Sequence, residues 1–221
     1  YYYCSSHSGM GGQANTPTTN SFSDFSGSIQ SNVSPNTTAG FSIVSFTGTG
    51  AAATVGHGLG STPGMIIFKN RNDAVAWAVY NKTIGSSKWI QLQSNAAQSA
   101  ASAVMFNSTD PTSSVFSVKT YGGSNGSSDD MIAYCFAEKQ GYCKIGSYTG
   151  NGNSNGAFVY TGFKPAWVLI KKSSSTGNWN IFDTKRDGYN GENENIFANA
   201  SDAESSGNNR IDIVSNGFKL R

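Results

Sequence analysis

Short hydrophobic stretches separated by clusters of Gly, Asn and Ser run through the chain from Phe41 onward. Side chains of contrasting size in 76–80, and of contrasting polarity in 178–182, alternate along the chain, which predicts half-buried β-strands. The runs 65–68 and 167–170 contain no polar residue and predict strands buried on both faces. Further strands are expected at 115–118 and 131–136. This succession of short strands and turns predicts an all-β fold with a sandwich or jelly-roll-like arrangement.

An internal repeat is the strongest long-range pattern in the sequence. The stretch SFTGTG at 45–50 recurs, after a shift of 102 positions, as SYTGNG at 147–152. The same shift relates further residues: Pro63 to Pro165, 65–69 to 167–171, Trp77 to Trp179 and Phe116 to Phe218. We therefore predict two tandem copies of one β unit, at 41–142 and 143–221.

The second copy stops early relative to the first. The first copy ends with the apolar strand at 131–136, and the second has no counterpart because only Arg221 follows Leu220. We expect a second copy that lacks its last strand and exposes unpaired backbone and apolar surface. Either the natural chain continues past Arg221, or a strand from elsewhere fills the gap, as in strand complementation between subunits. Residues 1–4 are a candidate donor, because 133–135 resembles them.

The residues before Phe41 have a different composition. Residues 1–12 begin with an aromatic, strand-like stretch that is followed by Ser and Gly turns. Residues 13–40 are rich in Pro, Asn, Thr and Ser with few apolar anchors, which predicts an extended linker or arm. Helical signals are poor throughout. The best candidate, 94–105, is rich in Ala but interrupted by Ser and badly capped.

Composition limits the class of protein without identifying it. Of the 221 residues 13% are charged and 12% aromatic, a balance that favours a folded core over disorder. The net charge is +2 and Lys and Arg form no patch, so nucleic-acid binding is not expected. The apolar runs are too short to span a bilayer, so membrane insertion is not expected either. Three cysteines make no disulfide framework, and free thiols are favoured over a disulfide at Cys135 and Cys143.

Cys4, His7 and Met10 lie at three-residue intervals. This spacing resembles the C-terminal ligand loop of cupredoxins, where a thiolate, an imidazole and a thioether bind copper. A blue-copper centre also needs a second His from an upstream strand, and the sequence has only one other His, His57. We therefore expect a remnant of a cupredoxin-like strand and loop in 1–12, with neither copper nor another cofactor bound.

Few other residues form a pattern that carries chemistry. His57 has glycines on both sides, and a turn His with solvent or backbone partners is favoured over a catalytic one. The acidic residues at 129–130 and at 183 and 187 have the spacing of neither a calcium loop nor a carboxylate pair. Four aromatic residues at equivalent places in the two copies predict either core packing, which is favoured, or a platform that stacks on glycans. They are Trp77, Tyr80, Trp179 and Phe182.

Four stretches of the chain resemble a known family. They are AYCFAE at 133–138, GSYTGNG at 146–152, YTGFKPAWV at 160–168 and SNGFKLR at 215–221. They are similar to an uncharacterised, duplicated β domain that is frequent in predicted virion and tail-fibre proteins of marine bacteriophages, including cyanophages. The resemblance covers about 41–221. The opening YYYCSSHSGMGG resembles a segment that closes a cupredoxin-like domain in similar phage proteins.

The resemblance implies a structural virion protein, in a tail fibre, spike or capsid appendage, that takes part in host attachment. It also implies a place in the extracellular particle, with further copies of the chain or other virion proteins as partners. It supplies no catalytic residues, and an enzyme is not expected. The alternative from another class is a carbohydrate-binding module whose ligand is a host surface glycan.

Overall fold

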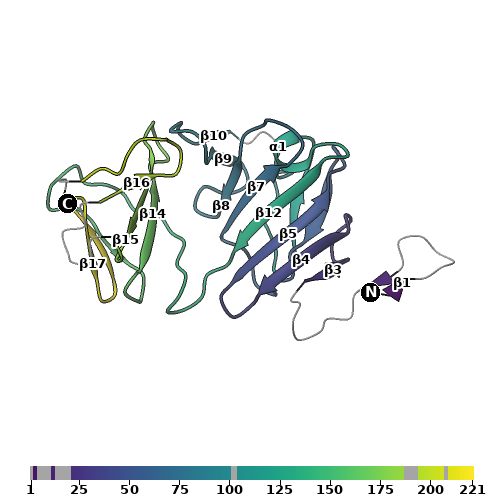
Figure 1. The fold of residues 1–221 in the computed structure, drawn as a ribbon, viewed down its shortest axis with the longest axis horizontal. Coiled ribbons are helices and arrows are strands. Elements are labelled where there is room, and N and C mark those ends of the chain that lie inside the picture. Colours follow the sequence, from purple (N-terminus) through teal and green to yellow (C-terminus); the bar gives the residue numbers. More distant parts are fainter. Residues whose placement is uncertain (1, 4–10, 13–20, 101–103, 187–193, 207–208) are drawn as a thin grey trace. The chain divides into compact units, whose positions relative to one another are not determined.

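The computed structural model of the chain describes residues 2–3, 11–12, 21–100, 104–186, 194–206 and 209–221. The chain forms two compact units. Unit 1 comprises Tyr1–Trp89 and Ala100–Glu138, and unit 2 comprises Ile90–Ser99 and Lys139–Arg221. Both consist of antiparallel β-strands (Figure 1), and the four-residue α1 (Gly122–Asn125) is the only helix in the described ranges. The prediction of an all-β fold is confirmed.

The main sheet of unit 1 has β12 (Asp130–Phe136) near its centre. This strand pairs antiparallel with β5 (Phe41–Thr47) on one side and with β7 (Met65–Asn70) on the other. Next to β5 the sheet continues with β4 (Ser31–Asn36) and then β3 (Phe22–Asp24). Next to β7 it continues with β8 (Ala78–Asn81), β9 (Lys88–Gln91) and β10 (Ser99–Ala100). The boundary between the two units falls within β9 and within β10.

Alternation along these strands places one face of the main sheet in the core of unit 1. Every second residue of β12 within 131–135 is buried. β6 (Ala53–Gly56) and β11 (Val115–Val118) pair as a second sheet, and the ring of Phe116 packs edge-on against Phe46 with their centroids 6.1 Å apart. The two sheets thus enclose one apolar core as a sandwich, and removal of that apolar surface from water stabilises the fold.

Part of the segment predicted as a linker belongs to this sheet. Within 13–40 the structure contains β3 and β4, and 13–20 lies outside the described residues. The linker prediction was wrong for these strands, because a low content of apolar residues does not exclude a strand with few inward positions. Val33 of β4 is fully buried. Ser31 lies on the same face, and its hydroxyl donates a hydrogen bond to the carbonyl of Gly56 at 2.9 Å.

One other expectation differs from the structure. Residues 65–68 are not buried on both faces, because β6 and β11 cover only one face of β7: Ile66 and Phe68 are buried while their neighbours are half-buried. The described part of 94–105 contains β10 and no helix. There the N–H of Gln98 donates to the carbonyl of Ser173 at 2.8 Å, so the backbone makes tertiary hydrogen bonds within unit 2 instead of helical ones.

The T-G-x-G loop that follows β5 is held in place by the side chain of Asn125. The Oδ1 atom of Asn125 accepts a hydrogen bond from the N–H of Thr49 at 2.8 Å. Its Nδ2 atom donates to the carbonyl oxygens of Ala51 at 2.8 Å and of Lys119 at 2.5 Å. Asn125 is fully buried, so these bonds also satisfy polar atoms that have no access to water.

Two glycines give this loop its shape. Gly50 has a φ of 63°, in the left-handed region that favours glycine. Gly48 lies so close to the turn after α1 that a Cβ atom there would overlap the carbonyl oxygen of Gly126. The T-G-x-G motif is therefore a packing requirement in unit 1: it lets the loop and the α1–β12 turn come together.

Unit 2 contains two three-stranded sheets. One is ordered β14 (Trp167–Lys171), β15 (Trp179–Asp183), β16 (Ile196–Phe197), and the other is ordered β13 (Phe158–Tyr160), β18 (Gly217–Leu220), β17 (Ile211–Val214). Their buried apolar residues form one small core of Val168, Phe182, Ile211, Ile213 and Phe218. The segment 90–99 belongs to this unit: the indole N–H of Trp179 donates to the carbonyl of Gln91 at 2.9 Å.

Parts of the two units correspond after the 102-residue shift. In the β7–β8 hairpin Met65 pairs with Asn81, and in the β14–β15 hairpin Trp167 pairs with Asp183, which is the same register. The edge-on ring pair of Phe46 and Phe116 has its counterpart in Tyr148 and Phe218, 6.4 Å apart. Duplication of the whole unit stays a prediction, and these shared features are consistent with it.

Substitution of Gly48 by Ala should destabilise unit 1, because the added methyl group must displace backbone in a closely packed turn. We expect a loss of roughly 1–3 kcal/mol in the free energy of unfolding. The matched control is Gly150→Ala in the second T-G-x-G loop, where nothing lies within 4 Å of a Cβ atom. Urea unfolding followed by tryptophan fluorescence measures both variants, and equal effects of the two substitutions would contradict the proposed role of Gly48.

Candidate functional site

The predicted metal-binding set, Cys4, His7 and Met10, lies outside the described residues. On either side of it β1 (Tyr2–Tyr3) pairs antiparallel with β2 (Gly11–Gly12). Within the described ranges, no group of three or more His, Cys, Asp or Glu side chains is placed to hold a metal ion.

The four aromatic residues predicted to form either core or a glycan platform lie mostly in the interior. Tyr80, Trp179 and Phe182 are buried, and the hydroxyl of Tyr80 donates to Asp110 at 3.4 Å. Trp77 is half-buried, with the ammonium group of Lys69 5.9 Å from its ring centroid. A buried ring offers no face to a sugar, so these residues do not combine into a stacking surface.

The thiols and carboxylates of the described residues show no arrangement for catalysis. Cys135 and Cys143 do not form a disulfide with each other, and burial raises the pKa of Cys135, which keeps it protonated and unreactive. Asp183 forms an ion pair with Arg186 at 2.7 Å, and hydrogen bonds from this partner lower its pKa. The side chain of Asp129 accepts a hydrogen bond from Asn70 at 2.7 Å. Asp183 and Asp129 therefore interact with other side chains of the protein.

His57 is fully buried in unit 1 and is hydrogen-bonded to the backbone. Its Nδ1 atom accepts from the N–H of Leu59 at 3.3 Å, which leaves the proton on Nε2, 3.3 Å from the carbonyl oxygen of Thr112. Burial lowers its pKa, against the opposing effects of the Thr112 hydrogen bond and of the charge on Asp24. The expected backbone partners are found, in the interior and not at the surface.

Large apolar side chains are exposed on the surface of unit 2. Trp167 of β14 is 55% exposed, and Phe158 and Tyr160 of β13 are 50% and 66% exposed. The prediction that 167–170 would be buried on both faces is therefore wrong at Trp167. Large exposed apolar side chains are typical of surfaces that bind a partner when they form a contiguous patch.

The strand β14 lies at the edge of its three-stranded sheet. Among the described residues β14 has a single hydrogen-bonded neighbour, β15, whereas the corresponding strand of unit 1, β7, is paired on both sides. An open edge of this kind presents a row of backbone donors and acceptors to a further strand.

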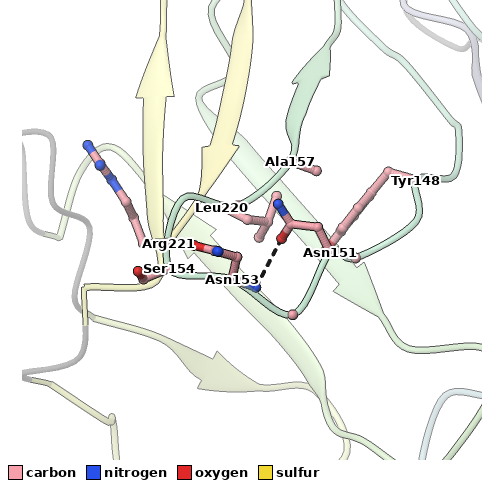
Figure 2. A pocket seen from close by; sticks show the side chains of 10 residues that line it. Tyr148, Asn151, Asn153, Ser154, Ala157, Leu220 and Arg221 are labelled. Atoms are coloured by element: carbon pink, nitrogen blue, oxygen red, sulfur yellow. Dashed lines mark hydrogen bonds between the residues drawn. The ribbon is translucent and has the colours of Figure 1, made fainter.

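A hollow of about 400 Å³ lies between the second T-G-x-G loop and the end of β18 (Figure 2). Tyr148, Asn151, Asn153 and Leu220 border it, and the N–H of Asn153 donates to Oδ1 of Asn151 at 3.1 Å. Its lining combines amide groups with aromatic and aliphatic surface and carries no acidic residue. Such a lining suits peptide or neutral polar groups better than a cation.

The described strands define an all-β protein built from antiparallel sheets. The chain belongs to the family described as a domain of unknown function (DUF7483), whose model matches residues 13–221. Comparisons with curated proteins and with solved structures find no match for the chain. Within the described residues, no helix is both long and apolar enough to cross a membrane.

The free energy of unfolding should fall as the pH is lowered below about 6.5, the ordinary pKa of His. The folded state keeps His57 neutral with a lowered pKa, whereas the unfolded chain protonates it freely. The unfolded state therefore binds more protons in the interval between the two pKa values, and stability is lost across it. Denaturant unfolding at several values between about pH 5 and 8 measures this slope.

The variant His57→Gln should flatten this pH dependence, because it removes the buried titrating group. His7→Gln is the matched control, since it removes the other His of the sequence. A slope that persists in His57→Gln and disappears in His7→Gln would contradict the assignment to His57.

Proposed function

We propose that this chain is a structural component of a phage particle, in a tail fibre, spike or capsid appendage, where it takes part in host attachment. The observation that carries the proposal is the contrast between the two units. Unit 1 has a sheet paired on both sides of its central strand, whereas unit 2 exposes the aromatic residues Phe158, Tyr160 and Trp167 and, within the described residues, has β14 at the edge of its sheet. A module of this kind assembles through its open side, and the resemblance of the sequence to virion proteins supplies the setting.

The composition supports the same role. A chain with 13% charged residues and a net charge of +2 has weak electrostatic repulsion between copies, which favours close assembly. The sheets give rigid layers, and the exposed surface of unit 2 supplies an apolar contact area. Further copies of the chain or other particle proteins are the proposed partners, in the extracellular particle.

A carbohydrate-binding module is the second candidate, and one observation favours it. Tyr160 and Trp167 expose aromatic rings, and the amides of Asn151 and Asn153 line the hollow. Stacking rings together with amide hydrogen bonds are the groups that bind sugars. Binding on an array of bacterial surface glycans, lost in Trp167→Ala with unchanged unfolding, would support this role. Absence of binding across the array would remove it.

Purified phage particles from the culture that produces this protein should contain the chain at a fixed stoichiometry. Mass spectrometry of gradient-purified particles should detect its peptides, and gold-labelled antibodies against it should decorate one type of appendage in electron micrographs. The major capsid protein of the same particles serves as the positive control. Recovery of the chain only from the particle-free fraction would overturn the proposal.

A further inference from the structure

One face of the β13–β18–β17 sheet is turned away from the core of unit 2. Val159 and Phe218 lie opposite each other in adjacent strands, and both pack into that core with Ile213. Because side chains alternate along a strand, the residues between these positions lie on the other face of the sheet. This face, called the outer face below, carries Phe158, Tyr160, Asp212 and Lys219.

Two aromatic side chains on the outer face come from β13. Phe158 and Tyr160 are each at least half exposed, and they are two residues apart in the strand. Residues with this spacing lie about 7 Å apart, so the two rings are neighbours along the strand. The ring of Phe158 reaches over β18 to Gly217, where a Cβ atom would lie 3.2 Å from the Cζ atom of Phe158. The glycine therefore leaves room for this ring to lie across the sheet.

The side chain of Lys219 brings a positive charge next to these rings. Lys219 lies directly opposite Phe158 in the register of β13 and β18. Its ammonium group donates hydrogen bonds to Oδ1 of Asn155 and to the carbonyl of Gly156, the latter at 3.3 Å. Both acceptors are neutral, so these bonds hold the ammonium group in place without cancelling its charge.

Two arginines extend this charge along the sheet. The N–H of Arg221 donates to the carbonyl of Arg210 at 2.9 Å, which continues the ladder of β17 and β18 by one pair. By alternation, both arginines share the outer face with Asp212 and Lys219. The guanidinium group of Arg221 forms an ion pair with Asp212, which is buried. Among these residues one carboxylate accompanies three cations, so the aromatic rings lie beside a net positive charge.

Exposed aromatic rings next to cations match a sugar chain that carries carboxylates. One face of a sugar ring consists of C–H groups, which pack favourably on the negative face of an aromatic ring. Carboxylates on the same sugar chain accept charge-assisted hydrogen bonds from ammonium and guanidinium groups. A neutral glycan would make no use of the cations, and a small inorganic anion would make no use of the rings.

We infer that unit 2 binds an acidic polysaccharide, built of uronic acids or similar carboxylated sugars, along the outer face. Phe158 and Tyr160 stack on sugar rings, and Lys219 and Arg210 bind the carboxylates. This inference deepens the proposed role in host attachment, on which it rests, by naming the chemical class of the bound surface. The site lies on a different sheet from Trp167 of β14.

Single-stranded nucleic acid is the other class of ligand that combines aromatic and cationic contacts. It fits this face less well, because its affinity depends on neutralising many phosphates, and the face offers three cations of which Arg221 is already paired with Asp212. Binding of a DNA oligomer is therefore included as a competing outcome of the test.

The probes are oligogalacturonate and alginate oligomers of defined length. The fully methyl-esterified oligogalacturonate is the matched neutral ligand, since it keeps the sugar rings and removes the charge. Calorimetric titration of the full chain should show saturable binding of an acid form, and this binding should weaken as the salt concentration rises. We expect the ester to bind at least about tenfold more weakly than the acid.

Two variants separate the contributions of ring and charge. Tyr160→Ala should weaken binding of acid and ester alike, whereas Tyr160→Phe should keep the parent affinity because the ring remains. Lys219→Gln should lower the affinity for the acid by at least about fivefold and reduce its advantage over the ester. Urea unfolding of each variant establishes that the fold is retained.

The matched controls are an aromatic residue and a cation that lie outside this sheet. Tyr142→Ala removes a side chain as exposed as that of Tyr160, and Lys172→Gln removes an exposed lysine. Both should bind the acid form like the parent protein. Losses in these controls equal to those in Tyr160→Ala and Lys219→Gln would contradict the assignment of the site to the outer face.

Three further results would overturn the inference. They are equal affinity for acid and ester, no binding of either acidic oligomer, and tighter binding of a single-stranded DNA oligomer than of both. Each leaves detection of the chain in phage particles unaffected. Conversely, a chain that binds the acidic oligomers but is recovered only from the particle-free fraction would overturn the proposed function alone, so the two proposals fail separately.

Discussion

The pairing of β12 on both sides determines how unit 1 is built. A strand near the centre of an antiparallel sheet sets the register of both adjacent strands. It does so through backbone hydrogen bonds and through the packing of its inward side chains against theirs. Here β5 and β7 are both aligned by β12, and the loops at their ends take their positions from it. The Asn125 network and the glycines of the T-G-x-G loop bring the turn before β12 against the end of β5. In unit 2 the β14–β15 hairpin has the same register as the β7–β8 hairpin of unit 1.

Much of this fold could be predicted from the sequence because its strands are short and strongly patterned. The 102-residue shift located both hairpins, and the apolar stretch at 131–136 is indeed a strand. Strands β3 and β4 could not be found from apolar content, because Ser31 takes an inward position by hydrogen bonding to a backbone carbonyl. A polar side chain in a core position is visible only once its partner is placed.

The candidate surface was harder to predict, because exposure depends on what each strand lies against. The sequence pattern treats 65–68 and 167–170 alike, yet Met65 is half-buried and paired with Phe136 of β12, while Trp167 at the matching position is 55% exposed. The hollow beside the second T-G-x-G loop could not be predicted, since it follows from the loop geometry around Asn151 and Asn153. Nor does the sequence distinguish the Asn125 network from an ordinary turn.

The segment 90–99 makes the two units inseparable by simple cleavage. It belongs to unit 2 by its hydrogen bonds, yet its neighbours on both sides in the sequence belong to unit 1. The chain therefore crosses between the units three times, and a single cut near Glu138 would leave them linked through 90–99. Cleavage at any one of these three crossings therefore leaves the units covalently connected through the other two.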